Sequence, residues 1–213
     1  MALIANPRQI DHIVWAVPDL SAGIAYIEDI TGEQPVYGGR HLQFGTHNAL
    51  LRLGNRCYFE ILAPDPENNE ITTSRWMGID LINSGRITRW ALSSSNLSKD
   101  VQHLITVNSK LGQVEEGQRL TASEQLLCWQ LSIPLSEPVC EPTPFLIDWQ
   151  NSVHPADNLT HNCTLVNFKV VHPNVAPINQ VLNELGSSVE VVSGQQPKLE
   201  LTLSTPKGMI TIV

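Results

Sequence analysis

Glu60 interrupts an apolar run, residues 58–62, that has the composition of a buried strand. An ionised carboxylate buried without a partner is costly, so we expect a second polar group beside it. His12 interrupts another apolar run, residues 10–17, and shares a strand face with Val14. A carboxylate and an imidazole in such surroundings can transfer protons or bind a metal ion, although a lone histidine on an apolar face is more often a satisfied core residue.

The turn at residues 54–56 determines which side chain of the preceding strand accompanies Glu60. A two-residue turn pairs odd residues of that strand with even residues of the next, which places His47 on the face of Glu60. A three-residue turn reverses the parity and offers Asn48 instead. Both alternatives are open from the sequence, and the two-residue turn is the basis for including His47 among the candidate site residues.

One pattern of elements occurs three times and must position these side chains. It consists of an apolar strand, a polar helix cap, an amphipathic helix that ends near a glycine, and two or three short strands. Each copy is too small to bury its own sheet face well, so the copies are expected to pair. The pattern predicts an α+β protein in which residues 1–150 hold two paired βαβββ modules, 1–66 and 86–150, and residues 151–213 form a third that packs on them or serves a homodimer interface.

The composition is that of a globular protein: of 213 residues 42% are hydrophobic and 16% charged, and the net charge is −8. The negative charge argues against a nucleic-acid surface, which needs an excess of Lys and Arg. No apolar run reaches the length of about 20 residues that crosses a bilayer, and no signal-peptide pattern is present. We therefore expect a cytoplasmic protein with neither nucleic acid nor membrane as a partner. The four cysteines lack CxxC spacing and are expected to be buried thiols.

Several segments together resemble the glyoxalase-like domains of the vicinal oxygen chelate superfamily. They read Asp-His-Ile-Val-Trp-Ala-Val-Pro-Asp-Leu at 11–20, Gly-Gly-Arg-His at 38–41, Gly-Thr-His-Asn-Ala-Leu-Leu at 45–51, Tyr-Phe-Glu-Ile-Leu-Ala-Pro-Asp-Pro at 58–66 and Pro-Phe-Leu-Ile-Asp-Trp at 144–149. The resemblance is specific for the fold and unspecific for the reaction, because the superfamily includes isomerases, lyases, ring-cleaving dioxygenases, antibiotic-modifying enzymes and pure binders.

The resemblance implies open, curled mixed sheets around a cleft, with metal ligands on the first and last strands of the modules. His12 and Glu60 stand at the positions that match the first module's ligands. Together with His47 they would form a two-histidine, one-carboxylate set suited to a divalent metal such as Fe, Mn, Zn or Ni.

The second module departs from this pattern. Counted from the helix starts, the residue equivalent to His12 is Arg89, which cannot bind a metal. The alternative is a metal-free cluster in which Glu60 accepts hydrogen bonds from His12 or Arg89 and leaves a polar pocket for an anionic or carbonyl ligand. Asp148, at the end of the second module's last strand, could supply a ligand or base, or merely bond a backbone amide.

Two functions follow from these candidates. The first is a metal-dependent lyase, isomerase or dioxygenase acting on a small oxygen-bearing metabolite, with Glu60, Arg89 and Asp148 as catalytic residues. The second is a binding protein that uses the same cleft without metal or turnover. In either case, His41 after its glycine-rich turn and the flat side chains of Trp129 and Trp149 are candidates for contact with a small-molecule ligand.

Overall fold

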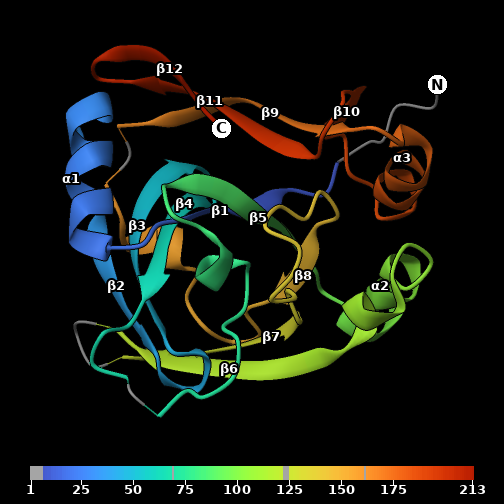
Figure 1. Ribbon diagram of the computed structural model, residues 1–213, viewed down its shortest axis with the longest axis horizontal. Helices are drawn as coiled ribbons and strands as arrows, with labels where there is room; N and C mark the ends of the chain where they lie inside the picture. Colours follow the sequence, from blue (N-terminus) through green and yellow to red (C-terminus); the bar gives the residue numbers. More distant parts are fainter. Residues whose placement is uncertain (1–6, 69, 122–124, 161) are drawn as a thin grey trace.

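The computed structural model describes residues 7–68, 70–121, 125–160 and 162–213. Eight strands form one mixed sheet in the order β2-β3-β4-β1-β5-β8-β7-β6 (Figure 1). Their bounds are β1 (Ile10–Ala16), β2 (Val36–His41), β3 (Thr46–Gly54), β4 (Cys57–Pro64), β5 (Arg86–Ser93), β6 (Val114–Leu120), β7 (Leu126–Ser132) and β8 (Phe145–Asp148).

The two halves of this sheet repeat one βαβββ arrangement. β1 and β5 pair antiparallel at its centre, and each is parallel to the last strand of its own half, β4 or β8. The helices are α1 (Leu20–Thr31) and α2 (Leu97–Leu104). Asp19 caps α1 by accepting a hydrogen bond from the Ala22 amide, and Gly32 ends it with φ 77°. These caps are at the residues that the sequence pattern indicates.

The outer strands of the two halves approach each other and nearly close the sheet on itself. Arg119 of β6 donates a hydrogen bond to the carbonyl oxygen of Gly38 in β2. Figure 1 shows these two strands converging on the side of the molecule away from β1 and β5. The predicted α+β fold with curled mixed sheets is confirmed.

The C-terminal part of the chain forms a second sheet of four strands in the order β10-β9-β11-β12. Phe168 of this sheet packs against Trp90 of β5 with ring centroids 5.1 Å apart, so the second sheet covers the outside of the curled sheet. Whether residue 150 separates two domains stays a prediction. The elements are β9 (Thr164–His172), α3 (Val175–Glu184), β10 (Glu190–Ser193), β11 (Lys198–Thr205) and β12 (Gly208–Ile212).

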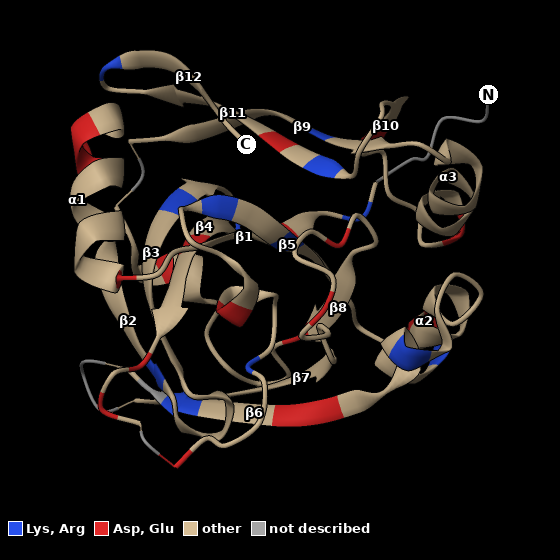
Figure 2. Ribbon diagram, viewed as in Figure 1, with Lys and Arg blue, Asp and Glu red and all other residues tan. Residues whose placement is uncertain are grey.

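Side chains alternate in direction along each strand, so one set packs in an outer core and the other faces the interior of the curled sheet. On β1, Ile13 and Trp15 join the outer core, whereas His12 and Val14 face inward. Acidic and basic residues are interspersed over the elements in Figure 2, with an acidic stretch at Glu115 and Glu116 on β6. Within the described part of the chain, no helix has the length and hydropathy needed to cross a membrane.

Candidate functional site

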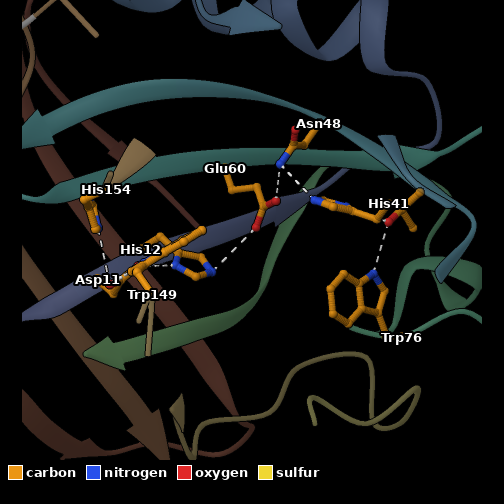
Figure 3. A network of polar contacts seen from close by, with 9 residues as sticks. Asp11, His12, His41, Asn48, Glu60, Trp76, Trp149 and His154 are labelled. Atoms are coloured by element: carbon orange, nitrogen blue, oxygen red, sulfur yellow. Dashed lines mark hydrogen bonds and ion pairs between the residues drawn. The ribbon is translucent and has the colours of Figure 1, made fainter. Parts of the chain in front are cut away.

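His12 and Glu60 meet inside the curled sheet, on the neighbouring strands β1 and β4. The Nε2 atom of His12 lies 3.7 Å from the Oε2 atom of Glu60 (Figure 3). Both residues are buried, with 3% and 4% of their surface exposed. They line a small cavity whose other walls come from both halves of the sheet. The remaining lining residues are His41, Asn48, Tyr58, Trp76, Met77, Arg119, Trp129, Leu131, Phe145, Ile147 and Trp149.

Asn48 of β3 is the closest partner of the Glu60 carboxylate. Its side-chain amide donates to the Oε1 atom of Glu60 at 2.6 Å. The same nitrogen lies 3.5 Å from the Nε2 atom of His41. Arg119 also faces this group: burial lowers the pKa of its guanidinium, while the charges of Tyr58 and Glu60 act in the opposite sense. The buried carboxylate is therefore compensated by an amide, an imidazole and a nearby guanidinium.

The prediction that His47 faces Glu60 is wrong, and Asn48 takes that place. The turn has two central residues, since Gly54 pairs with Cys57. The register then shifts between Arg52 and Gly54, so that Asn48 stands opposite Leu62 and shares its face with Glu60. This β-bulge has the effect expected of a longer turn. His47 points away from the cavity, is half-buried, and lies edge-on to Tyr37 with ring centroids 6.4 Å apart.

Asp11 is the hydrogen-bond partner of the other ring nitrogen of His12, Nδ1. Its Oδ1 atom lies 2.7 Å from the Nδ1 atom of His12, and its Oδ2 atom lies 3.3 Å from the Nε2 atom of His154. The indole nitrogen of Trp149 donates to both oxygens. Burial raises the pKa of Asp11, but the hydrogen bonds and charges of the two histidines outweigh it, and the net pKa is lower than usual. Asp11 is thus stabilised as a carboxylate.

His41 ends β2 and lies at the far end of the same polar cluster (Figure 3). It is only 4% exposed, and its Nδ1 atom lies 3.1 Å from the hydroxyl of Thr46, which also accepts from Trp76. Burial, reinforced by the charge of Arg119, lowers the pKa of His41 to about 3. It is therefore a neutral side chain of the cavity wall, and its contact with a ligand stays a prediction.

Trp129 and Trp149 both line the cavity, and their contact with a ligand stays a prediction. Their ring centroids are 5.5 Å apart, and Trp129 also meets His41 edge-on at 6.0 Å. Trp76 completes this aromatic wall, packing edge-on against His41 at 5.6 Å. The cavity has a volume of about 20 Å³, room for about one water molecule, so a larger ligand would require these rings to move.

Arg89 does not pair with Glu60, contrary to the metal-free alternative derived from the sequence. Its guanidinium is buried and donates to backbone carbonyls because the segment 135–139 folds over it. The acceptors are the carbonyl oxygens of Thr88, Leu135, Pro138 and Val139, at 2.7 to 3.2 Å. Arg89 is therefore an anchor for this segment.

Asp148 likewise lies outside the cavity. It accepts a hydrogen bond from the amide of Gln150 at 2.8 Å and lines a separate open cleft that also contains Arg8 and Arg56. Because Ile147 faces the cavity, its neighbour Asp148 points to the other side of the strand. The simpler expectation, a strand-end residue that bonds a backbone amide, matches this geometry.

The ligand set for a metal does not fit the superfamily pattern. In the ranges that the structure describes, no group of three or more His, Cys, Asp or Glu residues is placed to hold a metal ion. The second half of the sheet presents Phe145 and Ile147 to the cavity, and Ala91 stands opposite His12. The amide protons of Asn48, which repel a cation, occupy the space beside Glu60.

Sequence reasoning missed Asp11, Tyr58, Arg119 and His154. Asp11 could have been recognised from the sequence, because it places a carboxylate beside His12 at the start of an apolar strand. His154 is buried, and its Nδ1 atom accepts a hydrogen bond from the Ala156 amide. Nothing in the sequence marks Arg119 as a site residue, because its position depends on how the outer strands β2 and β6 converge.

Comparison with known proteins then settles the family. The sequence model of the glyoxalase-like domain matches residues 10–186. The chain belongs to the glyoxalase-like domain family. A hypothetical protein from Staphylococcus aureus has a similar structure, with 18% identity, a TM-score of 0.62, and coverage of 89% of this glyoxalase-like chain and 87% of that one. This likeness concerns the fold alone.

Weaker structural likenesses are to methylmalonyl-CoA epimerases. One, in complex with methylmalonyl-CoA and NH4+, is 15% identical, with a TM-score of 0.45 and coverage of 70% of this chain and 100% of that one. The Mycobacterium tuberculosis enzyme is 18% identical, with a TM-score of 0.43 and coverage of 74% and 97%. No curated protein matches the glyoxalase-like chain.

The neutral, buried His41 predicts acid sensitivity. Its folded pKa of about 3 lies below the ordinary 6.5, so the unfolded chain binds the extra proton and stability falls as the pH drops through this window. Between pH 7.5 and 5, this group alone should lower the free energy of unfolding by about 2 kcal/mol. Urea unfolding at both pH values checks this, and His41→Gln should lose that part of the decrease. An equal decrease in the variant would contradict the assignment.

Proposed function

We propose that this glyoxalase-like protein is an enzyme that moves a proton on a small oxygen-bearing metabolite, as an isomerase or lyase does. The observation that carries the proposal is the buried pair His12 and Glu60, 3.7 Å apart in a cavity with aromatic walls. This distance is longer than a direct hydrogen bond, but it leaves both the imidazole and the carboxylate able to exchange protons with one carbon acid bound beside them.

The surrounding residues suit this chemistry. The Nε2 atom of His12 faces the cavity and can accept a proton from the carbon next to a substrate carbonyl. The carboxylate of Glu60 stabilises the resulting imidazolium or takes the proton in turn. The guanidinium of Arg119 supplies positive charge for the oxygen that becomes negative, and Trp129 and Trp149 exclude water around it.

Proton exchange with solvent tests this function on many candidate substrates at once. We would incubate the protein in D₂O with a panel of small 2-oxo acids, hydroxyketones and aldehydes and follow the loss of carbon-bound proton signals by NMR. We expect at least one compound to exchange, and the rate to fall at least 100-fold in His12→Gln and Glu60→Gln. The matched control is His103→Gln, because His103 is a partly exposed histidine that pairs with Glu184.

The results separate catalysis from binding. Exchange that persists in both variants would contradict the roles given to His12 and Glu60. A compound that raises the thermal midpoint of the protein but never exchanges would instead support the second candidate, a binding protein without turnover. The observation that favours that candidate is the presence of Trp129 and Trp149 in the walls of the cavity.

A metal-dependent version of the enzyme is supported by one observation. The separation of His12 Nε2 and Glu60 Oε2 is compatible with two ligands of one ion. Metal analysis of the untagged protein tests it: a stoichiometric divalent metal that is lost in His12→Ala and Glu60→Ala would support the metal-dependent version. An absence of metal would leave the proton-transfer pair as the functional unit.

A further inference from the structure

We infer that Asp11 is a positioning residue that, with Trp149 and His154, holds His12 as the tautomer with its proton on Nδ1, so that the unprotonated Nε2 faces Glu60 and the cavity. This inference rests on the proposed function, in which Nε2 accepts the substrate proton. It assigns a role to three buried side chains outside the acid–base pair (Figure 3).

A β-bulge brings Asp11 and His12 together. Along β1 and β5, Ile10 pairs with Leu92 and His12 pairs with Ala91, which leaves Asp11 without an opposite residue. Neighbouring side chains of a regular strand point to opposite faces, but at this bulge the carboxylate reaches the adjacent imidazole at 2.7 Å. The bulge therefore turns a residue of the outer face into a partner of the cavity histidine.

Two further donors fix the charge state of Asp11. The indole of Trp149 can only donate, and it lies 3.3 and 3.1 Å from the two carboxylate oxygens. The Nδ1 atom of His154 accepts from the Ala156 amide at 3.2 Å, so the proton of a neutral His154 is on Nε2, which lies 3.3 Å from Asp11. Because donors surround it, Asp11 acts as an ionised acceptor.

The tautomer of His12 follows from this arrangement. An ionised Asp11 accepts a hydrogen bond from the Nδ1–H group of His12, and a neutral imidazole then has its lone pair on Nε2. Stacking on Tyr58, with centroids 4.7 Å apart and 12° between planes, and an edge contact with Phe145 at 5.2 Å fix the ring. The opposite tautomer would place an N–H where the substrate proton must be received.

The site therefore depends on a segment beyond the second half of the sheet. Trp149 directly follows β8, and His154 precedes the short 3-10 turn Pro155–Asn158. Both are far from His12 in sequence, and their hydrogen bonds to Asp11 connect them to its Nδ1 side. A purely structural role for Asp11 would stabilise the protein without controlling which nitrogen of His12 carries the proton.

Nitrogen NMR of the imidazole rings distinguishes these roles. In the ¹⁵N-labelled full-length protein at pH 8, long-range proton–nitrogen spectra should show His12 as a single tautomer protonated on Nδ1, assigned by comparison with His12→Gln. In Asp11→Asn, whose amide can donate as well as accept, this single tautomer should be lost. His154→Gln keeps a side-chain donor and should preserve it, whereas His154→Leu should speed exchange of the Nδ1 proton at least tenfold.

The result is independent of turnover. A wild-type His12 protonated on Nε2 would overturn the inference even if Asp11→Asn does not fold, as would a folded Asp11→Asn with an unchanged tautomer. If the Nδ1 tautomer is found but no compound exchanges its protons, the proposed function fails and the tautomer assignment stands. Where exchange occurs, Asp11→Asn should reduce kcat at least 10-fold with little change in KM.

Discussion

The Asn48→Asp variant is expected to bind a divalent metal ion such as Zn²⁺ or Mn²⁺. The new carboxylate would stand where the Asn48 amide now donates to Glu60 at 2.6 Å and approaches the Nε2 atom of His41 at 3.5 Å. His12 completes the group from the other side of Glu60, 3.7 Å away. Two imidazoles and two carboxylates in this space form a ligand set typical of these ions.

Without metal, the same variant should be less stable than the wild type. Two carboxylates at hydrogen-bond distance cannot both ionise in a buried site, and the lost amide donor leaves Glu60 without its closest partner. We expect the free energy of unfolding to fall by about 2–4 kcal/mol. Added metal should reverse the loss, by about 4 kcal/mol when its concentration is a thousand times the dissociation constant.

Calorimetric titration with ZnCl₂ and MnCl₂, together with thermal unfolding at several metal concentrations, measures both effects. Asn48→Ser is the matched control, because it removes the amide without adding a carboxylate and should gain no metal affinity. If Asn48→Asp and Asn48→Ser respond alike to metal, the geometry assigned to His12, Glu60 and His41 is wrong.

The Arg89→Met variant is expected to lose about 3 kcal/mol of unfolding free energy. The methionine can fill much of the space of the 1% exposed side chain, but it cannot donate to the carbonyl groups of Thr88, Leu135, Pro138 and Val139. Burial lowers the pKa of Arg89 to about 10, so the guanidinium is still charged at neutral pH and its hydrogen bonds are of the strong, charge-assisted kind.

Urea unfolding at pH 7.5 measures this loss, and Arg86→Met on the same strand is the control because Arg86 is exposed. Amide hydrogen exchange should rise in the segment 135–139 of the Arg89 variant before it rises in the central strands. A stability equal to that of Arg86→Met would show that the carbonyl contacts of Arg89 do not hold this segment.

Much of the fold was predictable from local patterns. The strands at 10–17 and 86–92 alternate or run apolar as buried strands do, and residues such as Asp19 and Gly32 mark helix ends by their own chemistry. The pairing of His12 with Glu60 was also within reach, because the first and last strands of one module are adjacent in the resembled fold.

The site predictions that were wrong or missing depend on contacts between distant segments, which local sequence patterns do not show. The sequence does not show that Arg119 reaches Gly38 across the converging edges of the sheet. Nor does it show that the segment 135–139 folds back over Arg89 and uses its donors. It also does not show that the path of the chain after β8 buries His154 beside Asp11.

The bulge near Gly54 determines which side chains of β3 share a face with Glu60, so the number of residues in the hairpin matters as much as their identity. Deleting one residue of β3 between the bulge and Asn48, with the turn and the bulge kept, would bring odd residues of β3 opposite even residues of β4 and present His47, instead of Asn48, to Glu60. A change in the length of β3 on the site side of the bulge would thus exchange an amide for an imidazole beside the carboxylate, with no substitution at the site itself. Insertions and deletions in this hairpin are therefore a route by which such a protein could gain or lose a metal ligand in a single evolutionary step.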